Sequence, residues 1–268
     1  MLNSCKTCLK TVHNGMKSLC YILIREMVKM FQTIFKRYEK KYLLNEKQYS
    51  AVLDVLKDCA LPDKYGKSTV CSIYYDTPDK RLIRASIERP VYKEKLRLRS
   101  YGVPNDSTDC FLELKKKYKG IVYKRRIATH YSQGVSYLKG DETALEPSQI
   151  KNEIDYFKAY YGTLSPSVDI FYNRLAFYDK EDPNVRLTFD SGILYRENEL
   201  DLKNGIYGET ILPDGMYLME IKTPGAMPLW TAEMLTRLKI YPVSFSKYGT
   251  AYKNILIKNS KSGGNYCA

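Results

Sequence analysis

The feature that most constrains the fold of this chain is a run in which every second residue is a cation. The cations of residues 93–99 are Lys93, Lys95, Arg97 and Arg99, and the leucines between the last three are Leu96 and Leu98. In a β-strand, residues i and i+2 point to the same face of the sheet. The run therefore predicts a strand with one cationic face and one apolar face.

The same alternation recurs in four further segments, 111–117, 170–177, 185–190 and 217–223. Their polar positions are Glu113, Lys115, Lys117, Tyr172, Arg174, Arg186, Thr188, Asp190, Glu220 and Lys222. Any antiparallel sheet with one solvated face alternates in this way. However, like charges on neighbouring strands repel each other, so we expect an anion to neutralise them.

Closing such a sheet would place the charged faces around a lumen and pack the apolar faces against helices. The sequence therefore predicts an α+β fold, a closed antiparallel β-tunnel with a lumen lined by Lys and Arg and with helices packed outside.

Three segments supply helices for the outer face. The first follows Asn45, which forms a capping-box pattern with Gln48, and the second begins at Ser148 and ends near Gly162. The third follows Pro224. The stretches 104–106 and 201–215 are rich in turn-forming residues and are predicted to be surface loops.

The chain of 268 residues carries a formal net charge of +13. This excess indicates an anionic partner, which could be nucleic acid, a membrane surface or a polyanionic small molecule. No apolar run approaches the ~20 residues of a membrane-spanning helix, so we expect no membrane span. The seven cysteines show no regular spacing, which indicates a reducing compartment. We therefore expect a cytoplasmic protein.

The sequence predicts one large domain with two extensions. Residues 1–30 are expected to form a flexible N-terminal extension, residues 31–258 the tunnel domain, and residues 259–268 a flexible tail. A zinc site is an alternative for the first segment. Its candidate ligands are Cys5, Cys8, His13 and Cys20. Their spacing fits no compact zinc module, so the flexible extension is favoured.

Several kinds of chemistry find no support in the sequence. His13 and His130 are the only histidines and lie in no triad-like spacing, and no glycine-rich nucleotide loop is present. Carboxylates among the cations are candidate metal ligands, namely Glu39, Glu113 and Glu220. The 25 tyrosines could stack bases. Aromatic residues fall mainly on the opposite strand face from the cations, so we expect no specific nucleic-acid partner.

Five motifs in order resemble the VTC domain, the polyphosphate polymerase domain of the vacuolar transporter chaperone complex. That domain belongs to the triphosphate tunnel metalloenzyme (CYTH-like) superfamily. The motifs are Tyr92-Lys-Glu-Lys-Leu-Arg-Leu-Arg-Ser-Tyr-Gly102, Leu112-Glu-Leu-Lys115, Phe171-Tyr-Asn-Arg174, Leu218-Met-Glu-Ile-Lys222 and Phe245-Ser-Lys-Tyr-Gly249. The resemblance runs from about Phe35 to Tyr252 and so covers most of the chain.

The resemblance implies an enzyme that uses ATP with Mn²⁺ or Mg²⁺ to lengthen a polyphosphate chain by its terminal phosphate. The implied catalytic residues are Lys41, Arg97, Arg99, Lys115, Arg174 and Lys247, and the implied metal ligand is Glu220. Substrate-binding residues implied by the resemblance are Lys124 or Arg126, Tyr172 and Ser246. The strand faces add Lys95, Arg186 and Lys222, and they independently select Arg97, Arg99, Lys115, Arg174 and Glu220.

One departure from the superfamily concerns the first strand. A Glu-x-Glu-x-Lys pattern is common there, whereas this chain reads Arg37-Tyr-Glu-Lys-Lys41. The missing carboxylate favours a polymerase over a two-metal hydrolase. The alternatives are a triphosphatase acting on inorganic or nucleoside triphosphates, and a non-catalytic polyphosphate or polyanion binder. We expect ATP and polyphosphate as ligands and a membrane-bound partner for any export, because the chain has no membrane helices of its own.

Overall fold

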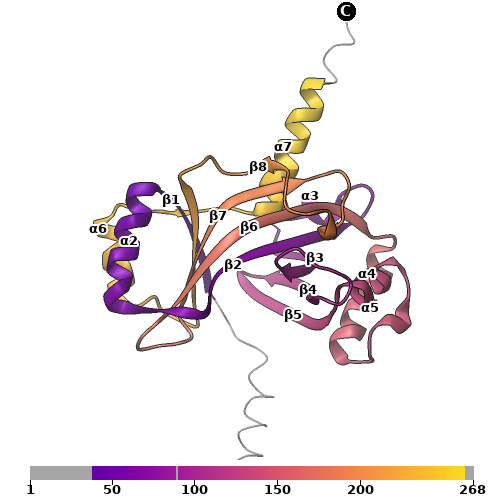
Figure 1. The fold of residues 1–268 in the computed structure, drawn as a ribbon, viewed down its shortest axis with the longest axis horizontal. Coiled ribbons are helices and arrows are strands. Elements are labelled where there is room, and N and C mark those ends of the chain that lie inside the picture. The colour runs from indigo at the N-terminus through magenta and orange to yellow at the C-terminus, as the bar shows by residue number, and fades with distance from the viewer. Residues whose placement is uncertain (1–37, 89, 263–268) are drawn as a thin grey trace, which may run out of the picture. The chain divides into compact units, whose positions relative to one another are not determined.

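The computed structural model describes residues 38–88 and 90–262, which all lie in the second of two units, Arg37–Ala268. The strands are β1 (Tyr38–Asn45), β2 (Ala60–Asp76), β3 (Tyr92–Tyr101), β4 (Asp109–Tyr118), β5 (Ile121–His130), β6 (Ser165–Asp179), β7 (Arg186–Arg196), β8 (Glu209–Thr210), β9 (Met216–Thr223) and β10 (Pro242–Val243). The helices are α2 (Glu46–Cys59), α3 (Arg81–Ile87), α4 (Tyr131–Lys139), α5 (Gln149–Tyr161), α6 (Leu229–Arg237) and α7 (Lys247–Ser262), with 3₁₀ turns η1 (Glu142–Ala144) and η2 (Leu202–Asn204). Figure 1 shows their arrangement.

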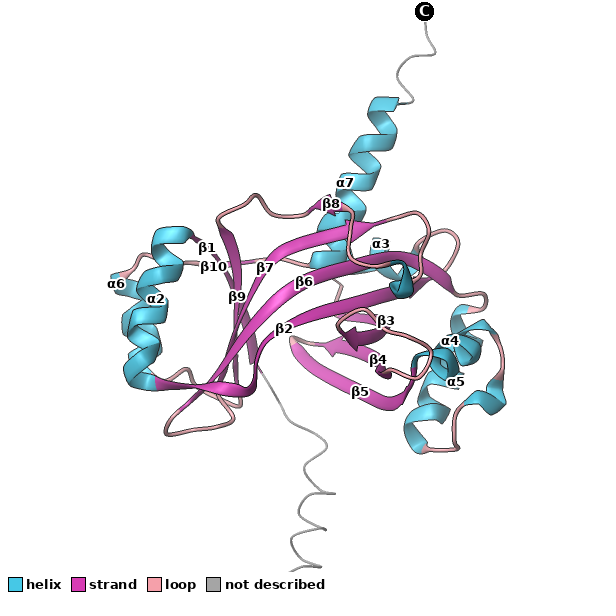
Figure 2. Ribbon diagram, viewed as in Figure 1, coloured by secondary structure: helices cyan, strands magenta, loops and turns pink. Residues whose placement is uncertain are grey.

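All ten strands form one antiparallel sheet in the order β10-β1-β9-β7-β6-β2-β3-β4-β5, with β8 on β7. Strands far apart in the sequence are neighbours, because β1 pairs along its full length with β9. Consecutive strands β3, β4 and β5 pair as hairpins. Figure 2 shows the strands as one curved, twisted array with helices around it. The α+β prediction with a large antiparallel sheet is therefore confirmed.

Closure of the sheet into a tunnel is met only in part. Among the described strands, no hydrogen-bonded ladder joins β5 to β10 or β1. Side chains connect the two ends of the sheet instead: Lys115 of β4 lies 3.3 Å from Glu39 of β1. Lys95 of β3 donates a hydrogen bond of 2.8 Å to Ser246, directly before α7.

Helices cover the apolar outer face in two groups. Helices α4 and α5 pack on β2, β3 and β4 around Leu98, Leu112 and Phe157. Helices α2 and α6 pack on β1, β7 and β9 around Leu56, Leu187 and Met234. Burial of these side chains is the main stabilising contribution.

A third apolar cluster lies on the inner face. Val70, Ile170 and Leu218 share the face of the cationic side chains and pack against Tyr248 and Ala251 of α7. Helices α3 and α7 thus cover one part of the inner face, and the charged side chains occupy the rest.

Local signals explain the predicted helices. The Gln48 N–H donates to Asn45 Oδ1 at 2.9 Å and the Asn45 N–H to Gln48 Oε1 at 3.2 Å, which confirms the capping box. Ser148 caps α5 by accepting from the Lys151 N–H, and the backbone turns at Gly162, where φ is +72°.

The structure also contains elements that the alternation did not indicate. Strand β2 is apolar on both faces, with Val70 and Tyr74 inside and Cys71 and Ile73 outside, so no alternation is visible. Strand β5 has cations on both faces. Helices α3, α4 and α7 were not predicted either.

The segment 201–215 differs from the predicted surface loop. It contains η2 and β8, and Leu202 is fully buried in the core under α4. The predicted zinc alternative, the segment 1–30 and residue Arg37 lie outside the described residues. The domain boundaries stay predictions, although α7 continues to Ser262. In the described part of the chain, no helix has the length and apolar character needed to cross a membrane.

Candidate functional site

Antiparallel register turns the predicted charges into cross-strand neighbours. Across β3, β4 and β5 the rows are Lys93–Lys117, Lys95–Lys115–Lys124 and Arg97–Glu113–Arg126. Across β6, β7, β9 and β1 the rows are Arg174–Asp190, Thr188–Glu220–Lys41 and Arg186–Lys222–Glu39. Side chains directly opposite each other lie ~4.5–5.5 Å apart at Cβ. The rows therefore place cations and a few carboxylates on one inner surface.

Glu113 anchors the cations on one side of this surface. The carboxylate is fully buried and lies 2.8 Å from Arg97 Nε, 2.6 Å from Arg126 Nη2 and 2.5 Å from Lys124 Nζ. Burial alone would raise the pKa of Glu113, but Arg97, Arg99 and Lys124 hold it far below its usual range. Both oxygens are thus taken by cations, so Glu113, a candidate metal ligand by sequence, acts here as an anchor.

Asp190 has the same role on the opposite side. It is fully buried, accepts from Arg174 Nε at 2.6 Å and from Arg174 Nη2 at 2.8 Å, and lies 2.5 Å from Lys247 Nζ. Burial opposes its ionisation, but Arg174 and Lys247 lower the pKa of Asp190. Such a bidentate pair fixes the guanidinium plane, and Lys247 ties the start of α7 to β7.

Glu220 lies among four cations. Its carboxylate oxygens are 2.9 Å from Lys222 Nζ, 3.3 Å from Lys41 Nζ, 3.8 Å from Lys247 Nζ and 3.9 Å from Arg174 Nη2. Burial alone would raise the pKa of Glu220, but these cations, Lys222 and Lys41 foremost, hold it well below its usual range. The opposite residue, Thr188, has a buried hydroxyl without a hydrogen-bond partner.

Two tyrosines orient the paired arginines. Arg97 Nη1 donates to the Tyr74 hydroxyl at 2.8 Å, and Arg99 Nη2 donates to the Tyr172 hydroxyl at 3.0 Å. Burial would raise the pKa of Tyr74, but Arg97, Arg99 and Lys247 lower it. Each guanidinium is therefore held in one position by the protein before any ligand binds.

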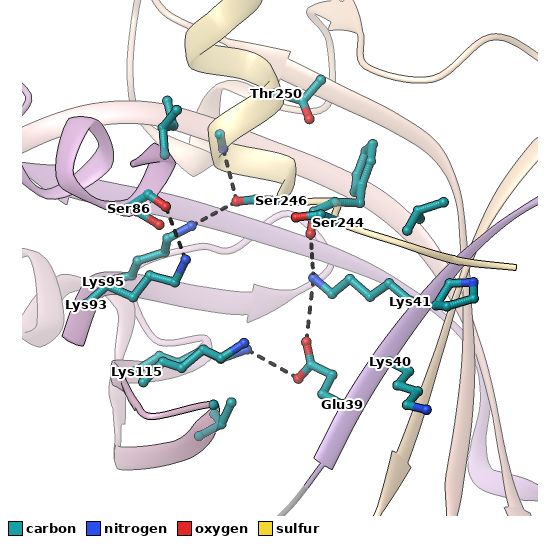
Figure 3. A pocket seen from close by; sticks show the side chains of 18 of the residues that line it. Glu39, Lys40, Lys41, Ser86, Lys93, Lys95, Lys115, Ser244, Ser246 and Thr250 are labelled. Atoms are coloured by element: carbon teal, nitrogen blue, oxygen red, sulfur yellow. Dashed lines mark hydrogen bonds and ion pairs between the residues drawn. The ribbon is translucent and has the colours of Figure 1, made fainter. Parts of the chain in front are cut away.

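A cavity of about 500 Å³ opens beside these anchored cations. Most of its charged lining residues are lysines: Lys40, Lys41, Lys93, Lys95, Lys115, Lys117 and Lys253. Glu39 is the one carboxylate in its described lining. Figure 3 shows Lys93, Lys95 and Lys115 reaching into the space from one wall and Lys41 from another. A volume of this order accommodates a drug-sized ligand.

The excess of positive charge in the cavity helps to lower the pKa values of Lys95 and Glu39. Burial, together with Lys41 and Lys115, holds the pKa of Lys95 well below its usual range. Burial would raise the pKa of Glu39, but Lys115, Lys41 and Lys222 lower it to about 2. The positive potential in the cavity thus disfavours a further cation and favours the binding of an anion.

The start of α7 forms another part of the cavity lining. Ser246 Oγ accepts from the Gly249 N–H at 3.1 Å and from Lys95 Nζ at 2.8 Å (Figure 3). The first N–H groups of a helix carry partial positive charge. This end of α7 therefore adds to the positive potential of the cavity.

The donor set tests whether Mn²⁺ or Mg²⁺ fits. In the described part of the chain, no three His, Cys, Asp or Glu side chains are grouped as metal ligands. Glu39 and Glu220 nevertheless lie close together, since both contact Lys41, at 3.5 and 3.3 Å. Mg²⁺ is usually bound by one or two carboxylates plus substrate phosphates. The residues therefore fit a metal that is bound jointly with phosphate oxygens, through Glu220 and Glu39.

Most predicted site residues come together on this surface. Ten of them contact one of the carboxylates Glu113, Asp190, Glu220 and Glu39, or one another: Lys41, Arg97, Arg99, Lys115, Lys124, Arg126, Tyr172, Arg174, Lys222 and Lys247. Two more, Lys95 and Ser246, are joined by a hydrogen bond beside the cavity. Arg186 does not join them, because its ion-pair partner is Asp63 of β2. Their catalytic and binding roles stay predictions.

Sequence reasoning missed Asp190 and Tyr74 as site residues. The alternation places Asp190 on the charged face, but its link to Lys247 depends on where α7 begins. Tyr74 lies on β2, whose two apolar faces hide the alternation. Lys93 and Lys117 were on the selected face, but only the cavity groups them with Lys253.

Comparison with solved structures supports the fold. Two similar structures are named putative adenylate or adenylyl cyclases. The protein from Bacillus halodurans shares 14% identity, with a TM-score of 0.50, over 79% of this chain and 95% of its own. The protein from Hippeastrum, described as having a dominant triphosphatase activity, shares 16% identity, with a TM-score of 0.48, over 81% of this chain and 96% of its own.

At this level of identity, the match to the Bacillus halodurans structure shows a shared fold. Comparison with curated protein sequences found no significant match. A family model described as "VTC domain" matches residues 36–256, which include all the anchored cations and the whole cavity lining. The chain belongs to the VTC domain family.

Proposed function

We propose that the chain is a metal-dependent polyphosphate polymerase that transfers the terminal phosphate of ATP to a growing polyphosphate chain. The observation that carries this proposal is the inner surface on which cations anchored by Glu113 and Asp190 adjoin a lysine-rich cavity of about 500 Å³. Anchored arginines suit phosphates that must be held in one geometry. The cavity supplies space and charge for more phosphates beside them.

In the proposed reaction, a terminal oxygen of the polyphosphate chain forms a bond to the γ-phosphorus of ATP. The bond from that phosphorus to the β–γ bridging oxygen breaks, and the bridging oxygen leaves with ADP and the electron pair. Phosphoryl transfer of this kind depends on positioning and charge neutralisation. The residues assigned to these tasks are Lys41, Arg97, Arg99, Lys115, Arg174 and Lys247.

Glu220, with Glu39 beside it, would hold Mn²⁺ or Mg²⁺ together with the phosphates. When bound, the metal supplies neutralisation of the charge on the phosphate oxygens. Before binding, Glu220 keeps Lys41 and Lys222 in place through contacts of 3.3 and 2.9 Å. With a metal held by Glu220, Lys41 and Lys222 could contact phosphate oxygens instead.

Further substrate contacts are assigned to Lys95, Lys124, Arg126, Tyr172, Lys222 and Ser246, but not to Arg186, which pairs with Asp63. We assign ATP and inorganic polyphosphate as the ligands and the cytoplasm as the location. If the product is exported, we propose a membrane-bound partner.

Two alternatives use the same surface. A triphosphatase that binds two metal ions would need more carboxylates than the pair Glu39 and Glu220, and the described residues hold no group of three. In a non-catalytic polyanion binder, Glu220 would lower the affinity, because a carboxylate among the cations weakens anion binding. Both observations favour the polymerase.

The test is incubation of the purified full chain with ATP and Mn²⁺, followed by electrophoresis on a urea gel. The expected product is a ladder or smear that an exopolyphosphatase removes, with one ADP formed per phosphate incorporated. Release of free phosphate without polymer would establish a triphosphatase. Tight polyphosphate binding without ATP consumption would establish a binder.

A further inference from the structure

Two rows of lysines lie opposite each other on β3 and β4. Lys93 is paired with Lys117, and Lys95 with Lys115. Like charges directly opposite on neighbouring strands are destabilising. Lys253 of α7 lines the same cavity. We call these four strand residues and Lys253 the lysine ladder.

The lysine on the outer face of β4 has more carboxylate partners. Lys116, between Lys115 and Lys117, lies 4.0 Å from Glu94 and 3.6 Å from Glu153. Lys117 and Lys253, in contrast, have no carboxylate within ion-pair distance among the described side chains. On the inner face of β4, Lys115 has one carboxylate partner, Glu39 at 3.3 Å, whereas Lys116 on the outer face has two. Among the described side chains, the inner face of β4 thus has fewer counter-charges than its outer face, and an anionic ligand would supply them.

The chemistry of the two cation types points to different ligands. An arginine held by a carboxylate recognises one phosphate in one geometry, whereas a lysine is a point charge on a flexible stem with rotatable donors. A row of lysines therefore binds a repeating anion at many registers. Such a surface suits a polymer that advances by one unit after each reaction.

We infer that the lysine ladder binds the body of the polyphosphate chain, several phosphates from the reacting end, and thereby sets the length of the product. The inference rests on the proposed polymerase activity. Chain release competes with each addition, so the average length rises as the ladder retains the chain longer. The low pKa of Lys95, caused by burial and by its lysine neighbours, agrees with a surface that gains from an added anion.

The test uses the full chain with Lys117→Gln and Lys253→Gln combined, since neither residue belongs to the core or to the catalytic set. Binding of long-chain polyphosphate and of tripolyphosphate is measured side by side. Loss of two lysine contacts should weaken the binding of the long chain roughly twenty-five-fold, at about fivefold per lysine. Tripolyphosphate, held by the anchored cations, should weaken at most about twofold.

Two further measurements sharpen the outcome. The dependence of long-chain affinity on salt should lose about 0.7–0.9 of logarithmic slope per lysine removed. On a urea gel, the longest products should become shorter. The matched control is Lys47→Gln with Lys139→Gln, which removes the same charge from exposed helix positions outside the cavity.

The control should leave long-chain affinity, salt slope and product length as in the unmodified protein. An equal loss for tripolyphosphate and the long chain would overturn the inference, as would an equal effect of the control. If the unmodified protein makes no polymer, the proposed function fails. The binding comparison still decides whether the ladder selects long chains.

Discussion

The two halves of the inner surface balance their charge in opposite ways. Around Glu113 and Asp190, every neighbouring cation is held by a fully buried carboxylate. In the lysine ladder, Lys115 has one carboxylate, Glu39, at 3.3 Å, and the rows pair lysine with lysine. In the first region each of these cations contacts a carboxylate of the folded chain, whereas in the second Lys117 and Lys253 have no carboxylate within ion-pair distance among the described side chains.

This difference separates two tasks that phosphate binding has to meet. Holding a reacting phosphate requires fixed donors, and a carboxylate that fixes them also reduces the repulsion between them. Holding a polymer requires affinity without a fixed register. The protein therefore bears the cost of burying Glu113 and Asp190 where geometry matters, and places fewer carboxylates among the lysines where it does not.

The largest expected effect breaks the compensated region. Glu113→Gln leaves Arg97, Lys124 and Arg126 without their counter-charge, and removing one partner of a buried ion pair costs about 3–5 kcal/mol. Urea unfolding should show this loss. The control Glu153→Gln, on the outer face beside Arg125, should cost at most about 1 kcal/mol. Equal losses in the two variants would mean that Glu113 is no special anchor.

The next prediction separates metal binding from ion pairing at Glu220. Glu220→Gln should remain folded and still bind tripolyphosphate, while turnover falls about a hundredfold, the size of effect found when one charged or polar transition-state contact is removed. Added Mn²⁺ should restore little, because the ligand itself is weakened. Melting temperature and Mn²⁺-titrated turnover are measured on one preparation. Near-normal turnover with a lowered melting temperature would assign Glu220 to ion pairing alone.

A pH titration probes Lys124, at the boundary of the two regions. Burial, opposed by Glu113 and aided by Arg97, lowers the pKa of Lys124 to about 7. The ammonium form binds anions, so tripolyphosphate affinity should fall as pH rises from 6 to 8. One charge-assisted contact corresponds to about tenfold.

Lys124→Arg is the matched variant, because a guanidinium stays charged throughout this range. The variant should show no step at pH 7, and comparison with the unmodified protein removes the titration of the ligand itself. Parallel pH profiles for the two proteins would show that Lys124 does not titrate there.

The smallest effect tests the uncompensated region. Lys117→Gln relieves repulsion from Lys93, so without ligand the free energy of unfolding should rise by a few tenths of a kcal/mol, about the size of one cross-strand pair. The gain should vanish near 1 M salt, where the Debye length is about 3 Å. A lower stability of the variant at low salt would contradict the idea that the rows of lysines repel one another.

The fold and the site were predictable to different depths. Alternation in residues 93–99 places Arg97 and Arg99 on one face because strand periodicity is a local property. The link from Glu113 to Lys124 and Arg126 depends on the register of β5, whose cations lie on both faces and hide the pattern. Tyr74 escaped notice for the opposite reason, since β2 is apolar on both faces.

The alternation of polar and apolar residues could not predict whether the sheet closes. The alternation records which face a residue occupies, and this is the same in a flat sheet, a curved sheet and a closed cylinder. Whether β5 meets β1 depends on twist and curvature accumulated over all ten strands. The contact of Lys115 with Glu39 results from that accumulation, and no local segment encodes it.

The absence of backbone hydrogen bonds between the described strands β5 and β1 has a consequence for how a long polymer could enter the space inside the sheet. A cylinder hydrogen-bonded all round can be entered only by feeding one end of the polymer through its mouth. Here the seam is fastened by side chains, chiefly Lys115 to Glu39 and Lys95 to Ser246. Unfastening it breaks no backbone ladder and becomes easier as salt rises. Such a seam would allow the middle of a polyphosphate chain, the ligand proposed above, to enter from the side.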